Sequence, residues 1–389
     1  MYKFPWFYIT TAILLFIAGC QKSDSTENEP EPACEPVSFA SSPSSEVYIV
    51  VLKDGDPGAR KVQSMENARL AGNHLLSRYR IPEQQMDVVL NTVNTGFIAR
   101  LTRDQAIRLK ADDEVELVEQ DRIITLEKGC FTVEAVSTVQ WGVRRTGADD
   151  GTGKRVWIID TGVDTDHPDL NVDITLSKCF ITNETSVEDE NGHGTHVAGI
   201  IGALNNSRGV LGVASGISII ALKALNNDGE GNTSGLIRAL NYVGQNAKAG
   251  EVVNMSLGAD TISNALDNAV RTLAEKGILF SIAAGNDAKK SILASPARVN
   301  HPNVFTVSAI DSLGRFATFS NFGNDAVDIA APGVRIVSTF SEGRYARLSG
   351  TSMAAPHVAG ILVLNGVNIK TKGTASDDPD GIPDPIISF

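Results

Sequence analysis

Positive charge is scarce in this sequence. Its 389 residues include 34 Lys and Arg against 46 Asp and Glu, which gives a formal net charge of -12. A surface that binds the phosphates of nucleic acid needs clustered Lys and Arg to displace counterions. The composition therefore argues against nucleic acid as a partner. The hydrophobic content of 42% is ordinary for a soluble globular protein, and the length allows two compact domains.

Long apolar runs are also scarce. The run FPWFYITTAILLFIAG follows Lys3 and stops at Cys20, and it is at the short end of the roughly 17 to 25 residues of a membrane span. We interpret residues 1–19 as a signal peptide. The ending Ile17-Ala18-Gly19-Cys20 resembles the lipobox of bacterial lipoproteins, which implies export from a bacterial cell and a lipid on Cys20 that holds the precursor to a membrane. An ordinary secretory signal beside a chance cysteine remains the alternative.

Residues 20–45 contain few large apolar side chains. The stretch QKSDSTENEPEPACEPVSFASSPSSE is rich in Ser, Glu and Pro, and such a composition cannot bury enough surface to fold. We therefore predict a disordered tether.

Residues 46–128 have the texture of a small folded domain. Strands are predicted in VYIVVLKDG, MDVVLNTV, GFIARLT and EVELVEQDRIITL, and helices in ARKVQSMENARLAGNHLLSRY and RDQAIRLKADD. The order β-α-β-β-α-β is the ferredoxin-like α+β pattern. The stretches YIVVLKD, GFIARLT and VELVEQD resemble the inhibitory propeptide of subtilisin-like proteases. An unrelated small binding module is the alternative, because this fold carries many functions.

Residues 129–370 alternate short apolar runs with helical segments. The runs are RVWIID, ISIIALKAL, VVNMSL, GILFSIAAG and VFTVSAI. Continuous apolar runs of this length are typical of strands buried on both faces, as in a parallel sheet flanked by helices. Ligands of such α/β sheets bind at the carboxyl ends of the strands.

Three polar residues follow or precede such apolar segments. Asp160 ends the run RVWIID, His193 lies between glycines before an apolar helix, and Ser352 begins the helix of GTSMAAPHVAG. Each has an ordinary alternative, as a turn or capping aspartate, a polar loop residue and a helix cap. Together, in the order Asp, His, Ser, they match the subtilisin form of a nucleophilic triad.

The blocks IIDTGVDTDHPDL, NGHGTHVAGI, NMSLG, SIAAGND and SGTSMAAPHVAG resemble subtilases, with the proteinase K-like branch as the nearest match. The resemblance implies that Ser352 is the nucleophile, His193 the general base and then acid, and Asp160 the residue that orients the imidazole. It also implies a subtilisin-like α/β fold. His196 and His357 lie in the same blocks, and we expect them to pack rather than to catalyse.

The same resemblance assigns the groups that stabilise the oxyanion and bind substrate. Asn286 matches the oxyanion asparagine, with the backbone N–H of Ser352 as the second donor; a simple turn at this position is the alternative. The edge to which substrate adds as a strand falls on Gly229 to Gly231. The walls of the first specificity pocket fall on Ser256, Leu257, Gly258, Ala283, Ala284 and Gly285. None of these wall residues is charged, which predicts cleavage after apolar or aromatic residues.

A structural Ca²⁺ is the one cofactor that we expect. The resemblance assigns its ligands to the backbone carbonyls of Pro302 and Val304 and to the side chain of Asp328, and oxygen ligands suit Ca²⁺. A solvated loop carboxylate is the alternative for Asp328. The tail, residues 371–389, is acidic, and we predict that it is disordered.

Only four cysteines are present, at positions 20, 34, 130 and 179. One disulfide is possible in an exported protein; we favour Cys130 with Cys179, and Cys34 with Cys130 remains open.

The sequence thus predicts an exported serine endopeptidase, made as a zymogen that its own propeptide inhibits, and monomeric. Two rivals remain: a noncatalytic binding protein of the same fold, and a lipase or esterase. The second is disfavoured because Ala354 stands where the G-x-S-x-G elbow needs its last glycine.

Overall fold

The computed structural model describes residues 36–53, 64–127, 129, 132–133 and 139–389. The predicted signal peptide, Cys20, Cys34 and Cys130 lie outside the described residues. No helix in the described ranges is long and apolar enough to cross a membrane.

The N-terminal domain has the predicted β-α-β-β-α-β order. Its elements are β1 (Ser38–Leu52), α1 (Met65–Arg78), a short 3-10 turn (Glu83–Gln85), β2 (Met86–Leu90), β3 (Gly96–Arg100), α2 (Arg103–Lys110) and β4 (Val115–Glu127). The strands form an antiparallel sheet in the order β4-β1-β3-β2. Local signals fix the helix starts, since Ser64 caps α1 and Thr102 forms a capping box with Gln105 at α2.

Successive buried side chains of β1 pack into two different cores. Val50 and Leu52 pack with the helices α1 and α2, whereas Ile49 and Val51 pack into a core that includes helices of the main domain. Successive residues of a strand point to opposite faces of a sheet. The N-terminal domain therefore presents one apolar face of its sheet to the main domain.

The predicted tether does not extend to residue 45. Strand β1 begins at Ser38, and Ser38 to Pro43 pair with Glu127 to Arg122 of β4. The prediction of disorder is wrong for these residues because β4 continues far enough to give them a partner strand. Residues 20–35 lie outside the described part.

The main domain is built on a nine-stranded sheet in the order β18-β19-β15-β14-β13-β12-β7-β10-β8. Its parallel strands include β7 (Arg155–Asp160), β10 (Ser218–Lys223), β12 (Val252–Met255), β13 (Leu279–Ala283), β14 (Val304–Ile310) and β15 (Ile329–Pro332), with the short β8 (Lys178–Cys179) at one edge. The five apolar runs singled out in the sequence each contain one of these strands. The predicted α/β architecture, a parallel sheet flanked by helices, is confirmed.

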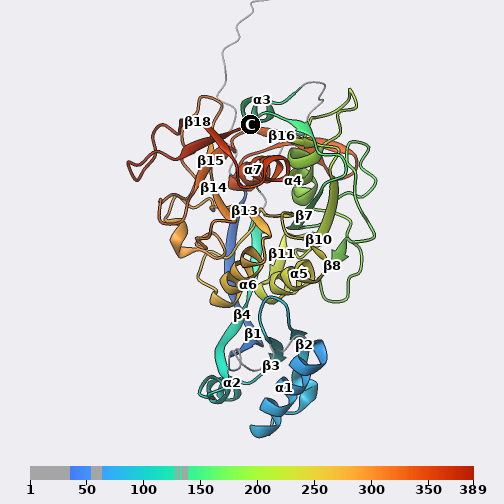
Figure 1. Cartoon of the computed structure of the whole chain (residues 1–389), viewed down its shortest axis with the longest axis vertical. Helices are drawn as coiled ribbons and strands as arrows, with labels where there is room; N and C mark the ends of the chain where they lie inside the picture. The colour runs from blue at the N-terminus through green and yellow to red at the C-terminus, as the bar shows by residue number, and fades with distance from the viewer. Residues whose placement is uncertain (1–35, 54–63, 128, 130–131, 134–138) are drawn as a thin grey trace, which may run out of the picture. The chain divides into compact units, whose positions relative to one another are not determined.

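Helices cover both faces of this sheet. Helices α4 (His193–Gly202) and α7 (Thr351–Asn365) lie side by side, as do α5 (Thr233–Asn246) and α6 (Asn264–Glu275) (Figure 1). Val156 and Ile158 of β7 share a core with α4 and α7, whereas Trp157 and Ile159 share one with α5 and α6. The two helix pairs therefore pack on opposite faces.

The smaller elements lie around the sheet. They are α3 (Trp141–Thr146), the three-stranded sheet of β16 (Ile336–Phe340), β17 (Arg344–Leu348) and β5 (Thr132–Val133), the pair β6 (Asp149–Asp150) and β9 (Ala214–Ser215), the 3-10 turn Ser291–Leu293, and β11 (Glu230–Asn232), which pairs with β4.

The acidic tail is ordered, so the prediction of disorder is wrong. Strand β18 (Lys370–Thr374) pairs with β19 (Pro385–Ser388), and β19 adds in parallel to β15. Ile386 and Ile387 are buried, and Asp384 is buried beside Ser308, whose hydroxyl donates to it at 2.5 Å. Burial of the two isoleucines at the end of the tail stabilises its ordered structure, although the rest of the tail is acidic.

The favoured disulfide is not formed. Cys179 carries a free thiol, whose sulfur accepts a hydrogen bond from the backbone N–H of Ile181 at 3.4 Å. Cys179 is half-buried, and burial raises the pKa of its thiol. Pairing of Cys34 with Cys130 stays a prediction, because both lie outside the described residues.

Candidate active site

Asp160 and His193 come together from two elements of the main domain. Asp160 is the last residue of β7 and His193 the first of α4, and Nδ1 of His193 lies 2.7 Å from Oδ1 of Asp160. A carboxylate can only accept, so this contact places the proton on Nδ1 and leaves Nε2 of the neutral ring as an acceptor. Both side chains are buried, and Nε2 has no hydrogen-bond partner among the described residues.

A glycine allows α4 to begin at His193. Gly192 is the N-cap, with a φ of +98°, and a Cβ on it would lie 2.3 Å from the ring of Phe340. Both the left-handed conformation and the ring exclude other residues. Gly192 therefore allows the helix to begin at His193, the residue that contacts Asp160.

Asp189 holds the segment around His193, and the sequence analysis missed it. Its Oδ1 accepts hydrogen bonds from the Thr161 hydroxyl and from the N–H groups of Asn191 and Gly192, and its Oδ2 accepts from the N–H and hydroxyl of Thr195. This buried carboxylate ties the residue after Asp160 to the first turn of α4. An acidic residue just before a predicted helix start was the available signal.

Lys223 is a second buried group that sequence reasoning missed. Its fully buried ammonium donates to the carbonyls of Thr161 and Glu188 at 2.8 and 3.0 Å and to Oδ1 of Asn227 at 3.0 Å. Lys223 thereby joins three loops: the loop after β7, the loop before α4 and the loop before β11. Its signal was a lone lysine inside the apolar run IIALKAL, since such a charge is buried only when paired.

Ser352 is the second residue of α7 and is not the helix cap. The N-cap is Gly350, which has no side chain to cap with. The Ser352 side chain is fully buried, and its hydroxyl donates to the carbonyl of Ser256 at 3.0 Å. The Ser352 to His193 hydrogen bond of a triad is therefore not made in this state. Such bonds often tighten only when substrate is bound.

Asn286, in the loop after β13, contacts the first residue of the same helix. Its Oδ1 accepts from the N–H of Thr351 at 2.7 Å, which leaves the Nδ2 amide as a donor next to the residues before Ser352. That donor is engaged by the carbonyl of Val37 at 2.5 Å. The predicted oxyanion donor is therefore in contact with another peptide carbonyl.

Four of the six predicted wall residues line one small cavity. Gly258, Ala283, Ala284 and Gly285 border it, together with Phe39 of β1. The other two, Ser256 and Leu257, are buried nearby; the Ser256 hydroxyl donates to the carbonyl of Ser352 at 2.8 Å.

The predicted strand-addition edge carries a strand. Residues 230–232 pair antiparallel with 125–123 of β4, and the N–H of Leu126 donates to the carbonyl of Gly229 at 2.8 Å. Peptides commonly bind proteins by adding a strand to such an edge. The end of β4 thus occupies the place predicted for substrate.

Comparison with known proteins identifies the family. The model of the subtilase family matches residues 151–368, and that of the peptidase inhibitor I9 family matches residues 47–127. The chain belongs to the subtilase family. It is a serine protease made as a zymogen, with an inhibitor-type propeptide ahead of its catalytic domain.

Named relatives agree with this assignment. The chain is 34% identical to alkaline serine exoprotease A of Vibrio alginolyticus over 90% of this chain and 67% of that protein. It is 39% identical to a thermostable alkaline protease of Halalkalibacterium halodurans over 81% of this chain and 85% of that protein. Among solved structures, a cold adapted subtilisin-like serine proteinase matches with a TM-score of 0.57 and 35% identity, covering 64% of this chain and 97% of that one.

The inhibitor domain of this subtilase docks on the N-termini of α5 and α6. Asp121 is fully buried and accepts from the N–H and hydroxyl of Ser234, in the first turn of α5, at 2.9 and 2.7 Å. Glu119 accepts from the N–H of Ala265, in the first turn of α6, at 3.3 Å. Carboxylates are favourable at helix N-termini, where backbone N–H groups are unpaired.

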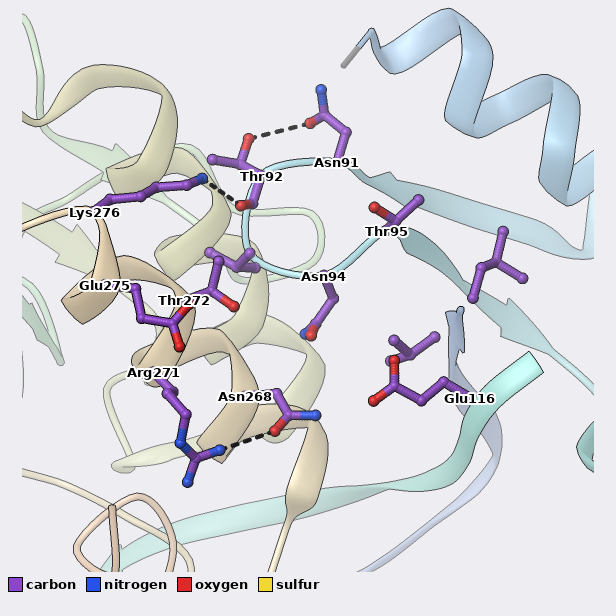
Figure 2. A pocket seen from close by; sticks show the side chains of 13 residues that line it. Asn91, Thr92, Asn94, Thr95, Glu116, Asn268, Arg271, Thr272, Glu275 and Lys276 are labelled. Carbon is purple, nitrogen blue, oxygen red and sulfur yellow. Dashed lines mark hydrogen bonds between the residues drawn. The ribbon is translucent and has the colours of Figure 1, made fainter. Parts of the chain in front are cut away.

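A loop of the inhibitor domain faces α6 across a polar cavity of about 640 Å³ (Figure 2). Lys276 donates to the carbonyl of Thr92 at 2.6 Å at one end of this contact, and Asn94 donates to the carbonyl of Ala265 at 3.1 Å. The contact thus combines an apolar sheet face with hydrogen bonds at its margin.

His196 and His357 are buried and contact backbone carbonyls. Nε2 of His196 lies 3.1 Å from the carbonyls of Ile336 and Ala346, and Nδ1 of His357 lies 2.8 Å from the carbonyl of Met353. Burial lowers the pKa of His196 to about 3 and that of His357 to about 4. Both rings are therefore neutral at ordinary pH.

The predicted calcium ligands flank two neighbouring strands. Val304 begins β14, directly after the loop that contains Pro302, and Asp328 precedes β15 and accepts from the N–H of Thr306 at 2.8 Å. Within the described ranges, no cluster of three or more His, Cys, Asp or Glu could hold a metal, but the predicted set needs only one carboxylate. Asp328 is an exposed residue, and desolvation raises the pKa of its carboxyl to about 6. Carboxylate and carbonyl oxygens are the ligand type that Ca²⁺ prefers, so the chemistry of the predicted donors is compatible with this ion.

Proposed function

We propose that this chain is an exported serine endopeptidase that hydrolyses peptide bonds through Asp160, His193 and Ser352. The observation that carries the proposal is the contact of 2.7 Å between Nδ1 of His193 and Asp160, which leaves Nε2 free to accept a proton. With the cleft open, a rotation of the Ser352 side chain away from Ser256 would free its hydroxyl for this base.

The chemistry follows from these positions. Ser352 Oγ attacks the scissile carbonyl while Nε2 of His193 takes the hydroxyl proton, and Asp160 stabilises the imidazolium. The tetrahedral oxyanion accepts hydrogen bonds from Nδ2 of Asn286 and from the N–H of Ser352. His193 then gives its proton to the leaving amine. In the second half of the reaction, His193 takes a proton from water, which attacks the acyl-enzyme, and returns a proton to Ser352 Oγ as that bond breaks.

We further propose a preference for apolar or aromatic residues before the cut. The support is that Gly258, Ala283, Ala284 and Gly285, which border one cavity, are small and uncharged, and that the aromatic ring of Phe39 borders the same cavity in this state. Asp260 and Asp287 also line this cavity. Substrate would add to the edge at Gly229 to Gly231, where β4 now pairs.

The maturation cut is proposed to fall at Leu126 to Gly129. Leu126, Glu127 and Gly129 line a small cavity together with His193, so this part of the chain passes the catalytic base. A cut here, made by the catalytic domain itself, would separate the inhibitor domain from the catalytic domain.

Five finer assignments rest on the sequence alone. We propose that the precursor is lipid-anchored through Cys20 and that the mature enzyme is released outside the cell. We propose that it is a monomer, that it belongs to the proteinase K-like branch, and that Pro302, Val304 and Asp328 bind a structural Ca²⁺.

Covalent labelling tests the proposed function against its rivals. A fluorophosphonate should label the mature chain at Ser352, and a peptide library should be cleaved after apolar or aromatic residues. Ser352→Ala should lose both activities, whereas Ser256→Ala, which changes the neighbouring hydroxyl, should still be labelled. Labelling without peptide cleavage would favour the lipase or esterase, and the absence of labelling would favour the noncatalytic binding protein.

A further inference from the structure

Residues 37–43, called the N-terminal arm below, precede the inhibitor domain and lie in the catalytic cleft. They are outside the residues that match the inhibitor family, which begin at Val47. A change of pairing register between Pro43 and Tyr48 and a positive φ at Glu46 separate the arm from the rest of β1. The arm is therefore a distinct structural unit.

The arm occupies the oxyanion donor. The carbonyl of Val37 accepts from Nδ2 of Asn286 at 2.5 Å, and its N–H donates to the carbonyl of Ser349 at 3.2 Å. Val37 is thus bonded on both sides to residues that hold the start of α7. A scissile carbonyl that needs the same Asn286 donor cannot bind while Val37 is there.

The arm also occupies the specificity pocket. Phe39 is 7% exposed and borders the cavity of Gly258 and Ala283 to Gly285. Val37 and Phe39 are the two large apolar residues of the otherwise polar stretch from Gln21 to Glu46. The chain therefore buries in the cleft the only large apolar side chains that this stretch has.

Polar contacts hold the rest of the arm against β4 and the catalytic domain. The hydroxyl of Ser41 donates to Asp260, and Arg122 of β4 donates to the Ser41 carbonyl at 3.1 Å. Ser38 donates to Glu127 at 2.8 Å. The strand order β11-β4-β1 places β4 between the arm and the substrate edge.

We propose that the N-terminal arm is a second inhibitory element, which blocks the oxyanion hole and the specificity pocket while β4 blocks the strand-addition edge. The proposal rests on the proposed function, because it gives Asn286 and the pocket their catalytic roles. The inhibitor domain and the arm thus cover different parts of one cleft. The arm must leave before the bond at Leu126 to Gly129 can be cut, because the oxyanion of that cut needs Asn286.

The rate of self-processing tests the proposal on the full chain. We compare Phe39→Asp with Ser42→Asp, which adds the same charge to the same strand at an exposed position. Phe39→Asp should release the arm and process roughly tenfold faster, because it removes the burial of a large apolar side chain. Ser42→Asp should process at the wild-type rate.

Amide hydrogen exchange in an unprocessed chain provides a second measurement that does not depend on the rate of self-processing. In the Ser352→Ala chain, residues 37–43 should exchange slowly, and Phe39→Asp in that background should make them exchange fast while residues 47–52 stay protected. Unprotected residues 37–43 in Ser352→Ala, or processing of Phe39→Asp that is no faster than that of Ser42→Asp, would overturn the proposal. Processing that continues in Ser352→Ala would instead contradict the proposed function.

Discussion

The two halves of the active site differ in what holds them. The half with the base, at α4, is fixed by groups of the catalytic domain, chiefly Asp189 and Lys223. The half with the nucleophile, at α7, has Asn286 bonded to Val37 of the arm and Ser352 bonded to Ser256. The base is therefore positioned by the catalytic domain itself. In the nucleophile half, Ser352 is held by the catalytic domain, but the oxyanion donor Asn286 is engaged by the propeptide region.

Apart from loss of Ser352, the largest effect on turnover is expected from loss of the oxyanion donor Asn286. Asn286→Gly should lower kcat by about 10² to 10³, the range known for loss of one oxyanion donor in a subtilisin. Asn286→Asp is a second variant: it retains the acceptor for Thr351 N–H but replaces the donor with an anionic oxygen, so it should lower kcat at least as far. Steady-state kinetics of the mature enzyme measure both. An unchanged kcat would remove Asn286 from the oxyanion hole.

A smaller effect is expected from the support of the base half. Asp189→Asn leaves one acceptor oxygen where five donors now converge, and it should destabilise the fold by about 2 to 4 kcal/mol. It should also lower kcat/KM by about tenfold, since a displacement of about 1 Å in a catalytic group can cost up to 100-fold. Thermal unfolding and kinetics are compared with Glu188→Gln, an exposed neighbour. If the two variants behave alike, Asp189 does not position His193.

The smallest effect on turnover is expected from calcium, because its proposed ligands belong to neither half. Chelation should lower the thermal midpoint, and saturating Ca²⁺ at about 100 times its Kd should add roughly 2.7 kcal/mol of stability. Asp328→Ala should remove this dependence, and Asp325→Ala, at an exposed position close by, should keep it. Equal responses of the two variants to a chelator would place the site elsewhere or exclude it.

Much of the fold could be predicted from the sequence, because its signals are local. The run RVWIID is strand β7 residue for residue, and the helix starts at Ser64 and Thr102 carry their own caps. The positions of Asp160, His193 and Ser352 at element ends were likewise visible in the pattern.

The rest depended on contacts between distant segments. Residues 38–43 are polar on average and form a strand only because β4 extends beside them. The acidic tail is ordered through two isoleucines at its end. Asp189 gave a weak signal because an acidic residue before a helix start is common on protein surfaces. Its burial follows from the packing of the start of α4 against the segment after β7.

N-terminal sequencing of the processed chain is the most direct test of the central claim, that this protein is a zymogen cut by its own Asp160, His193 and Ser352. In wild type, the new N-terminus should arise from a cut at Leu126 to Gly129, next to the cavity that also contains His193. Ser352→Ala, made in a host that lacks other proteases, should remain full length apart from removal of its signal peptide. The same cut in Ser352→Ala would contradict the claim.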